Sequence, residues 1–205
     1  ALANGSYTVT ASVTDPAGNT GSGNSNGSVD TTAPTISVVA PSNTNDNTPT
    51  ITGTTDAAPG STVTLVVTDS TGAVQTLTAT VQPGGSYSAT PGSALADGSY
   101  TVTASVTDPA GNTGSGNSNG SVDTTAPTIS VVAPSNTNDN TPTITGTTDA
   151  APGSTVTLVV TDSAGAVQTV STIVQPGGSY SATPGSALAN GSYTVTASVT
   201  DPAGN

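Results

Sequence analysis

The chain contains no Lys, Arg, His, Cys, Met, Trp, Phe or Glu. Its 12 charged side chains are therefore all Asp, and the net charge of −12 has no side-chain cation to balance it. Proteins recognise phosphate groups with Lys and Arg, so nucleic acids and anionic membrane surfaces are poor partners for this chain. Without His, Cys, Lys or Glu, a Ser or Thr nucleophile has no ordinary general base, and we predict that the chain is not an enzyme and has no small-molecule substrate.

The absence of Cys removes any constraint from the redox compartment. No apolar run is long enough to span a bilayer, so no membrane insertion is expected. What is present is a chain rich in Thr, Ser and Val, with 24 Gly and 15 Pro. Disorder and a mucin-like stalk both fit this composition poorly, because the apolar and polar residues alternate with a period of two, as they do in strands.

The sequence repeats itself. Ala1-Leu2-Ala3 recurs at Ala94 and again at Ala187, which gives a period of 93 residues. Residues 1–112 and 94–205 differ at only 7 positions. A unit of this length is longer than a solenoid repeat and matches one small β-sandwich, so we expect a tandem array of independently folded domains.

Alternating segments, bounded by Gly, Pro, Asp and Asn turns, mark about seven short strands in each unit. In one unit we expect them at 35–39, 50–55, 62–68, 74–81, around Tyr87, at 99–107 and in the Gly- and Asn-rich segment after Asn112. This spacing is typical of immunoglobulin-like domains. The predicted fold class is therefore all-β, with tandem immunoglobulin-like β-sandwiches. Tyr100, at the start of the sixth strand, stands where such domains carry a tyrosine corner.

This strand assignment sets the domain boundaries. Residues 1–30 hold the last two strands of a preceding domain, 31–123 form a complete domain, and 124–205 form a domain that lacks its final strand. The expected partners are the neighbouring repeats of the same chain.

Clustered carboxylates without cations repel one another unless a hard divalent ion lies among them. In a sandwich of this topology, the loop between the second and third strands and the loop between the sixth and seventh strands lie at the same end. The chain enters the first strand at that end. Oxygen ligands from both connections and from the linker should meet there, and Ca²⁺ takes six to eight of them, whereas Zn²⁺ and copper prefer the absent His and Cys. The ligands expected at the two junctions are Asp30, Asp56, Asp108 and Asn112, then Asp123, Asp149, Asp201 and Asn205.

Every aspartate of the chain, at the junctions or elsewhere, can also be explained without a metal ion. An Asp at the first position of a turn accepts hydrogen bonds from the backbone N–H groups of that turn. We favour this explanation for Asp69 and Asp162, which lie in Asp-Ser-x-Gly hairpins. Asp97 is replaced by Asn at its two equivalent positions, which suits a turn better than an obligatory ligand. The further calcium candidates, for which both explanations stay open, are Asp46, Asp139 and Asp97.

Several motifs resemble a known family. They are the linker at 123–128 (DTTAPT), the turn at 146–150 (GTTDA), and the run from 95–100 (LADGSY) to 108–112 (DPAGN). These segments look like the bacterial Ig-like repeats of giant surface adhesins of the type I-secreted, RTX and biofilm-associated kind, and the resemblance covers the whole chain. It implies a long extracellular stalk, exported by a type I system, in which Ca²⁺ held by the junction residues named above stiffens the domain junctions. The complete lack of Lys, Arg and Glu departs from the family pattern.

The expected function is a structural extender of a bacterial cell-surface adhesin, which projects an adhesive tip for cell adhesion or biofilm formation. An extracellular setting agrees with the dissociation constants of extracellular calcium modules, around 10⁻⁴ to 10⁻³ M. One alternative is a multivalent module that binds carbohydrate or another surface, for which the chain offers only 5 Tyr as aromatic platforms. A second alternative is a filament subunit, in which residues 1–30 complete the open domain 124–205 of a neighbouring chain.

Overall fold

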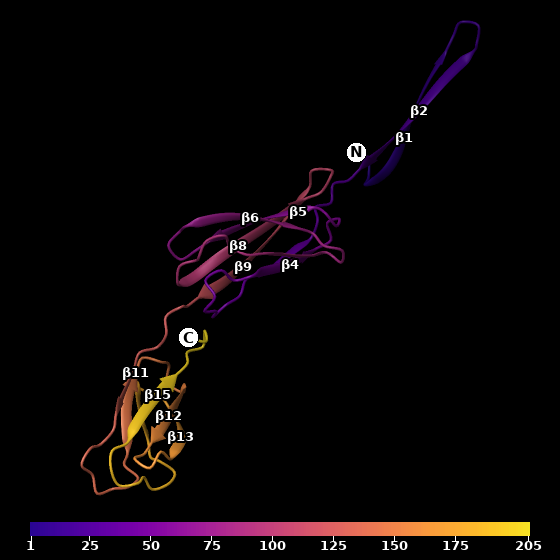
Figure 1. Ribbon diagram of the computed structural model, residues 1–205. Helices are drawn as coiled ribbons and strands as arrows, with labels where there is room; N and C mark the ends of the chain where they lie inside the picture. The colour runs from indigo at the N-terminus through magenta and orange to yellow at the C-terminus, as the bar shows by residue number, and fades with distance from the viewer. The chain divides into compact units, whose positions relative to one another are not determined.

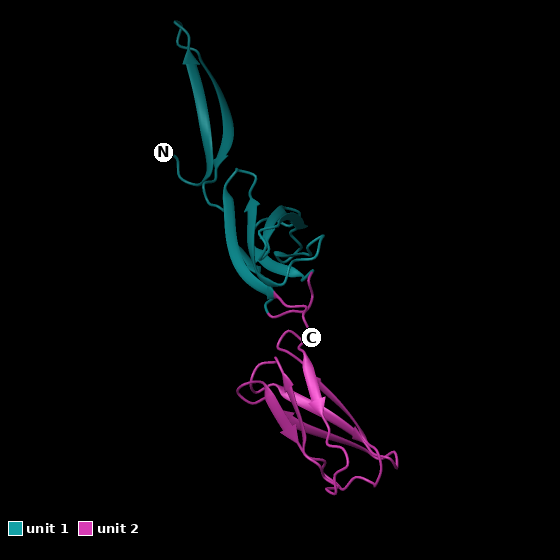
Figure 2. Ribbon diagram, turned by 90° about the vertical axis from the view of Figure 1, so that its left-hand side faces the viewer, with its two compact units in different colours: residues 1–42, 48–121 teal, residues 43–47, 122–205 magenta.

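Strands make up all of the regular secondary structure, as the computed structural model of residues 1–205 shows (Figure 1). None of the chain forms a helix that could cross a membrane. The residues form two compact units, and each is described by itself (Figure 2). The first unit holds residues 1–42 and 48–121, and the second holds residues 43–47 and 122–205.

The first unit begins with a two-stranded hairpin. Strand β1 (Gly5–Thr14) pairs antiparallel with β2 (Thr20–Val29), in a register that sets Gly5 opposite Val29 and Thr14 opposite Thr20. Val9 and Val13 of β1 are 55% and 73% exposed, so the hairpin buries little apolar surface of its own.

The rest of the first unit is a sandwich of two sheets. One sheet has the order β3-β4-β7 and the other the order β6-β5-β8-β9. The strands lie within one or two residues of the predicted segments, which confirms the predicted immunoglobulin-like architecture. Their bounds are β3 Ile36–Val39, β4 Ile51–Thr55, β5 Thr62–Thr68, β6 Val74–Thr80, β7 Ser86–Ala89, β8 Gly98–Thr107 and β9 Thr113–Val122.

The alternation of side chains along the central strands builds the core. In β5, Val63, Leu65 and Val67 are fully buried, while Val66, between the last two, is exposed. In β8, Val102 and Ala104 are fully buried in the same way. Because successive side chains of a strand point to opposite faces, this pattern fixes which face of each sheet turns inward.

Two buried tyrosines bond to backbone carbonyls in and after β3, Tyr87 from the same sheet and Tyr100 from the other. Tyr100, on β8, is 1% exposed and donates its hydroxyl to the carbonyl oxygen of Pro41, which follows β3, at 2.8 Å. Tyr87, on β7, donates to the carbonyl oxygen of Ser37 at 2.5 Å, and burial raises the pKa of Tyr87 to about 12. Tyr100 stands at the predicted place, but it does not make the local bond of a tyrosine corner, because the carbonyl that accepts its hydroxyl lies 59 residues upstream, just after β3.

The glycines of β9 are explained by a close approach between backbones. A Cβ atom on Gly114 would clash with the carbonyl oxygen of Pro34, and one on Gly116 would lie 2.8 Å from that of Ile36. Further along, the N–H of Ser121 donates to the carbonyl oxygen of Pro41 at 3.2 Å. The residue numbers on both sides rise together, so β9 runs parallel to the segment 34–41.

The second unit repeats the sandwich, with sheets β10-β11-β14 and β13-β12-β15. Its buried core is made by Ile144, Val156, Leu158, Val160, Val174, Tyr180 and Leu188. No strand follows β15 in the sheet order, so Tyr193, Val195 and Val199 are only partly buried, whereas Tyr100 and its neighbours in β8 are buried. The strand bounds are β10 Ile129–Val132, β11 Ile144–Thr148, β12 Thr155–Thr161, β13 Val167–Ile173, β14 Ser179–Ala182 and β15 Thr194–Val199.

Candidate functional site

The candidate site is the segment that leads into the first strand of each sandwich, residues 30–35 in the first unit and 123–128 in the second. We refer to both as entry segments. Each contains the sequence Asp-Thr-Thr-Ala-Pro-Thr. The sequence analysis predicts that two loops converge on each entry segment, and the hydrogen bonds test this placement directly.

The loop between the second and third strands holds the C-terminal end of each entry segment. In the first unit the N–H of Thr35 donates to Asp56 Oδ1 at 2.8 Å, and the N–H of Asp56 donates to the carbonyl oxygen of Thr35 at 3.4 Å. The second unit repeats this exchange between Thr128 and Asp149, and the Thr128 hydroxyl adds a bond to Asp149 Oδ2 at 2.7 Å. The sequence analysis missed the two threonines, because a backbone N–H leaves no signal in a pattern of residue types.

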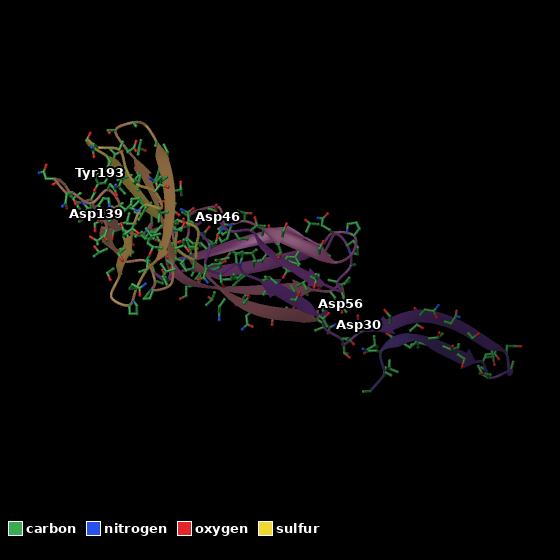
Figure 3. All side chains as sticks on the ribbon, turned by 90° about the horizontal axis from the view of Figure 1, so that it is seen from below. Asp30, Asp46, Asp56, Asp139 and Tyr193 are labelled. Carbon is green, nitrogen blue, oxygen red and sulfur yellow. The ribbon has the colours of Figure 1, made fainter.

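The loop between the sixth and seventh strands holds the N-terminal end of the entry segment. Asn112 Nδ2 donates to the carbonyl oxygen of Asp30 at 3.1 Å and to Asp108 Oδ2 at 2.9 Å. In the second unit Asn205 Nδ2 donates to the carbonyl oxygen of Asp123 at 2.7 Å. Both loops therefore lie at the entry end of their sandwich, as the topology predicts, and Figure 3 labels Asp30 and Asp56 at that end of the first unit.

Within these loops the carboxylates organise their own turns. Asp108 Oδ1 accepts the N–H groups of Ala110 and Asn112, each at 2.9 Å. The side-chain amide of Asn112 is the largest cause that lowers the pKa of Asp108 below its usual value. Asp201 repeats the arrangement, and its pKa is lowered chiefly by the amide of Asn205. The amide nitrogens of both asparagines thus act as donors between a loop and the entry segment.

The carboxylates of each predicted set do not gather into one cluster. No three acidic side chains lie close enough together to hold a metal ion. Asp30 accepts the N–H of Thr32 at 3.0 Å, and Asp123 that of Thr125 at 3.1 Å, so these two also bond within the entry segment. The donor chemistry suits Ca²⁺, because every side-chain ligand is an oxygen. The geometry is that of turn residues around a shared segment, and the metal assignment of these residues stays a prediction.

At the other end of each sandwich, an aspartate joins the third-to-fourth hairpin to the loop before the sixth strand. Asp69 Oδ1 accepts the N–H groups of Thr71 and Ala73, and Asp69 Oδ2 accepts that of Ala96 at 3.3 Å. Asp162 is 9% exposed, and its pKa is lowered first by the N–H of Ala189. These contacts agree with the turn explanation that the sequence favours for both residues.

The further calcium candidates lie in loops with bonds of their own. Asp139 Oδ1 accepts the N–H of Thr141 at 2.9 Å, and the N–H of Asp46 donates to the Thr44 hydroxyl at 3.1 Å. The carbonyl of Asp97, and not its carboxylate, accepts the Ser70 hydroxyl at 2.7 Å. In the second unit Asp139 lines a hollow of about 120 Å³ with Asn190 and Tyr193, and Figure 3 labels Asp139 and Tyr193 near one another.

A comparison with protein families identifies the module. The bacterial Ig-like domain matches residues 35–124 and again residues 128–205. The chain belongs to the bacterial Ig-like domain family. This membership confirms the predicted all-β sandwich fold and the tandem arrangement. Bacterial Ig-like domains of this repeat type are non-enzymatic modules of surface-exposed proteins.

Three solved structures are similar to this bacterial Ig-like chain. The "tetra-tandem repeat in extending region of large adhesion protein" is 42% identical, with a TM-score of 0.45. The match covers 100% of this chain and 55% of that protein's chain. A 1.5-MDa bacterial ice-binding adhesin is 27% identical, with coverages of 99% and 71% and a TM-score of 0.48. A Ca²⁺-stabilized adhesin of an Antarctic bacterium that binds ice is 27% identical, with coverages of 95% and 55% and a TM-score of 0.43.

The chain therefore spans about half the length of the first of these proteins, 55% of it. No curated protein matches the chain.

Proposed function

We propose that this chain is a structural extender in a bacterial cell-surface adhesin, which projects an adhesive tip for cell adhesion or biofilm formation. The observation that carries the proposal is the entry segment, held at one end by an aspartate of the second-to-third loop and at the other by an asparagine of the sixth-to-seventh loop. Both repeats make this arrangement with the same residue types at the same spacing. A segment bonded at both ends has less conformational freedom than a flexible linker, which is what an extender requires.

The 42% identity to a repeat described as the extending region of a large adhesion protein gives the proposal its setting. We place the chain outside the cell on the bacterial surface, after export by a type I system. Its repeats are taken as 31–123 and 124–205, with 1–30 as the end of a preceding repeat. Its partners in this role are neighbouring repeats of the same chain.

We further propose that Ca²⁺ binds at the entry segments. One entry segment begins with Asp30, and Asp56 and Asp108 lie in the two loops that share hydrogen bonds with it. The equivalent residues are arranged in the same way at the other segment. A divalent ion would draw these carboxylates together and offset part of a net charge of −12 that no side-chain cation balances. One of the similar adhesins is described as Ca²⁺-stabilized.

The test compares thermal unfolding and small-angle scattering of the chain in millimolar Ca²⁺, in Mg²⁺ and in chelator. If free Ca²⁺ stands at 100 times the dissociation constant, binding adds about 2.7 kcal/mol to the free energy of unfolding. For a domain of this size, that corresponds to a melting temperature higher by about 10 to 20 °C. The scattering profile should also become that of a stiffer particle.

The variant Asp56→Asn separates the two explanations of the aspartates. It retains Oδ1, which accepts the N–H of Thr35, but removes the charge that Ca²⁺ requires. We expect it to melt like the parent in chelator and to lose part of the Ca²⁺ response. Asp69→Asn, at the far end of the sandwich, is the matched control and should keep the full response. If melting and scattering are indifferent to Ca²⁺, or if both variants respond alike, the calcium assignment is wrong and the aspartates are turn residues.

The carbohydrate alternative depends on accessible aromatic rings. Tyr87, Tyr100 and Tyr180 are 2%, 1% and 2% exposed, and their hydroxyls bond to backbone carbonyls inside the sandwich. These three rings offer no platform for a sugar. Tyr7 and Tyr193 are half-buried, and the Tyr193 hydroxyl also bonds to a backbone carbonyl, so no tyrosine is fully exposed and the extender remains the function that the geometry supports best.

A further inference from the structure

The tripeptide Asn-Gly-Ser occurs four times in the chain, beginning at Asn4, Asn26, Asn119 and Asn190. The local covalent chemistry is the same at all four places. Any difference in reactivity between them must therefore come from the folded structure.

An Asn that precedes Gly is chemically labile. The backbone nitrogen of the Gly attacks Cγ of the Asn, a new C–N bond closes a five-membered succinimide, and the side-chain nitrogen leaves as ammonia with the proton from the Gly N–H. Water then opens the ring at one of its two carbonyls and leaves an aspartate or an isoaspartate. Gly favours the attack because it has no Cβ to obstruct the nitrogen and adopts many backbone conformations. Water is the only co-reactant.

Asn190 has the setting that this reaction needs. It is exposed, it lies in a bend before β15, and no hydrogen bond holds its side chain. Gly191 is also exposed, with φ of 131°, outside any strand. The reacting peptide group lies outside any strand, and the Ser163 hydroxyl bonds to its carbonyl oxygen, an acceptor that the cyclic intermediate retains.

The other three copies are held. Asn119 lies within β9, where Gly120 is buried against the Pro41 carbonyl and the Tyr100 ring. Asn26 lies within β2, and its Oδ1 accepts the Thr8 hydroxyl at 2.8 Å. The Asn4 side chain makes three hydrogen bonds, with the N–H of Thr31 and with the hydroxyls of Thr31 and Thr32. Each site must break bonds before it can react.

The aspartate product is already present in the chain. Asp97 occupies the position equivalent to Asn190, in the otherwise identical segment Ala-Leu-Ala-x-Gly-Ser-Tyr. Its carbonyl accepts the Ser70 hydroxyl at 2.7 Å, as the carbonyl of Asn190 accepts that of Ser163 at 2.8 Å. The fold thus tolerates a carboxylate at this place.

We propose that Asn190 is a site of spontaneous deamidation, which converts its loop to the form that Asp97 has by sequence. The product adds one negative charge to the hollow that Asn190 shares with Asp139. In the folded chain the reaction is confined to Asn190, and the strand copies are protected.

The experiment follows the folded chain at mildly alkaline pH by peptide mass spectrometry and ion exchange. Trypsin finds no Lys or Arg to cut, and chymotrypsin would release the same peptide, Ala-Asn-Gly-Ser-Tyr, from 3–7 and from 189–193, so endoproteinase Asp-N is used. It cuts before Asp and places Asn190 in the peptide 162–200 and Asn4 in 1–14, while the strand copies Asn26 and Asn119 lie in the identical peptides 15–29 and 108–122, which are read together. We expect Asn190 to lose its amide at least about tenfold faster than the strand copies Asn26 and Asn119 read together, because even 1.4 kcal/mol of local opening slows a reaction tenfold. The variant Asn190→Asp provides the ion-exchange standard for the aspartate product, and Asn190→Gln should abolish the early acidic species.

A second arm measures the same chain in denaturant. There the four identical tripeptides should react at similar rates, which shows that the fold creates the difference. Equal rates in the folded chain for Asn190 and for the strand copies Asn26 and Asn119 read together would overturn the proposal. So would an Asn190 that stays intact in the folded chain while it converts in the unfolded one, or an acidic species that appears equally fast in Asn190→Gln.

Discussion

Replacing Tyr100 with Phe removes one hydroxyl group from the core of the first unit and leaves the ring in place. Tyr100 is 1% exposed, and its hydroxyl bonds to the carbonyl oxygen of Pro41 at 2.8 Å. The equivalent change in the second unit is Tyr193→Phe, which removes a bond of 2.6 Å to the carbonyl oxygen of Pro134. The two substitutions are chemically identical, so the burial of the site decides how their effects differ.

The structure sets the size of each effect. A buried acceptor left without a partner costs about 1 to 3 kcal/mol. The carbonyl oxygen of Pro41 keeps a second partner, the N–H of Ser121 at 3.2 Å, so we expect Tyr100→Phe to cost about 1 to 1.5 kcal/mol, near the lower end of that range. Tyr193 is only partly buried, and water can replace its hydroxyl. We expect Tyr193→Phe to cost about 0.5 kcal/mol.

Hydrogen exchange read by mass spectrometry measures both units in one chain. The peptide that reports β8 must include Asp97, and the peptide that reports β15 must begin before Ala187, because residues 98–112 are identical to 191–205 and residues 1–19 are identical to 187–205. Tyr100→Phe should speed the exchange of β8 by about tenfold, since 1.4 kcal/mol corresponds to a factor of ten. Tyr193→Phe should speed the exchange of β15 by roughly twofold. If Tyr193→Phe has the larger effect, or if Tyr100→Phe has none, burial is not what sets the value of these hydroxyls.

Three further results are expected. The folded chain should lose stability as pH falls below about 4. Hydrogen bonds lower the pKa values of Asp69, Asp108 and Asp162 in the folded chain, so the unfolded chain binds protons at a higher pH than the folded one. Denaturant titrations that show no loss of stability between about pH 4 and pH 2 would contradict this. Asn112→Ala should raise the pKa of Asp108 toward its usual value, measured by an NMR titration of that carboxyl, with Asn205→Ala as the control that leaves Asp108 unchanged. Gly53→Ala should lower the free energy of unfolding by about 3 kcal/mol, because the added Cβ would meet the Ser37 carbonyl and the Tyr87 ring. Gly92→Ala, whose Cβ would meet nothing, should be nearly neutral in the same unfolding experiment. Equal effects of the two variants would refute the close packing.

The sequence predicted the strands well because alternation and turn residues are local signals. The segment 62–68 was placed correctly, since Val63, Leu65 and Val67 alternate with polar or outward residues and Asp69 begins a turn. The partner of Tyr100 could not be predicted in the same way. Its hydroxyl bonds to a carbonyl just after β3 of the other sheet, and only the packing of the two sheets decides which carbonyl lies within reach.

The candidate site was predicted in part for a similar reason. Topology was sufficient to bring the loops that carry Asp56 and Asp108 to the entry segment, and the hydrogen bonds of Thr35 and Asn112 confirm that placement. Topology says nothing about the direction of a carboxylate within its loop. Asp108 bonds the N–H groups of its own turn, which is the explanation without metal that the sequence also offered. Residue types alone do not decide between that explanation and a metal ligand, because an Asp suits both.

The parallel course of β9 and the segment 34–41 has a mechanical consequence. The chain enters the first sandwich beside Pro34 and leaves it along β9, beyond Ser121. Tension applied between these two points pulls neighbouring parallel segments in opposite directions along their length. Their contacts then carry the load together, in shear, and cannot open one after another like a zipper. Single-molecule pulling should therefore find one abrupt, high-force rupture for this sandwich, with the first and last strands acting as its tensile clamp.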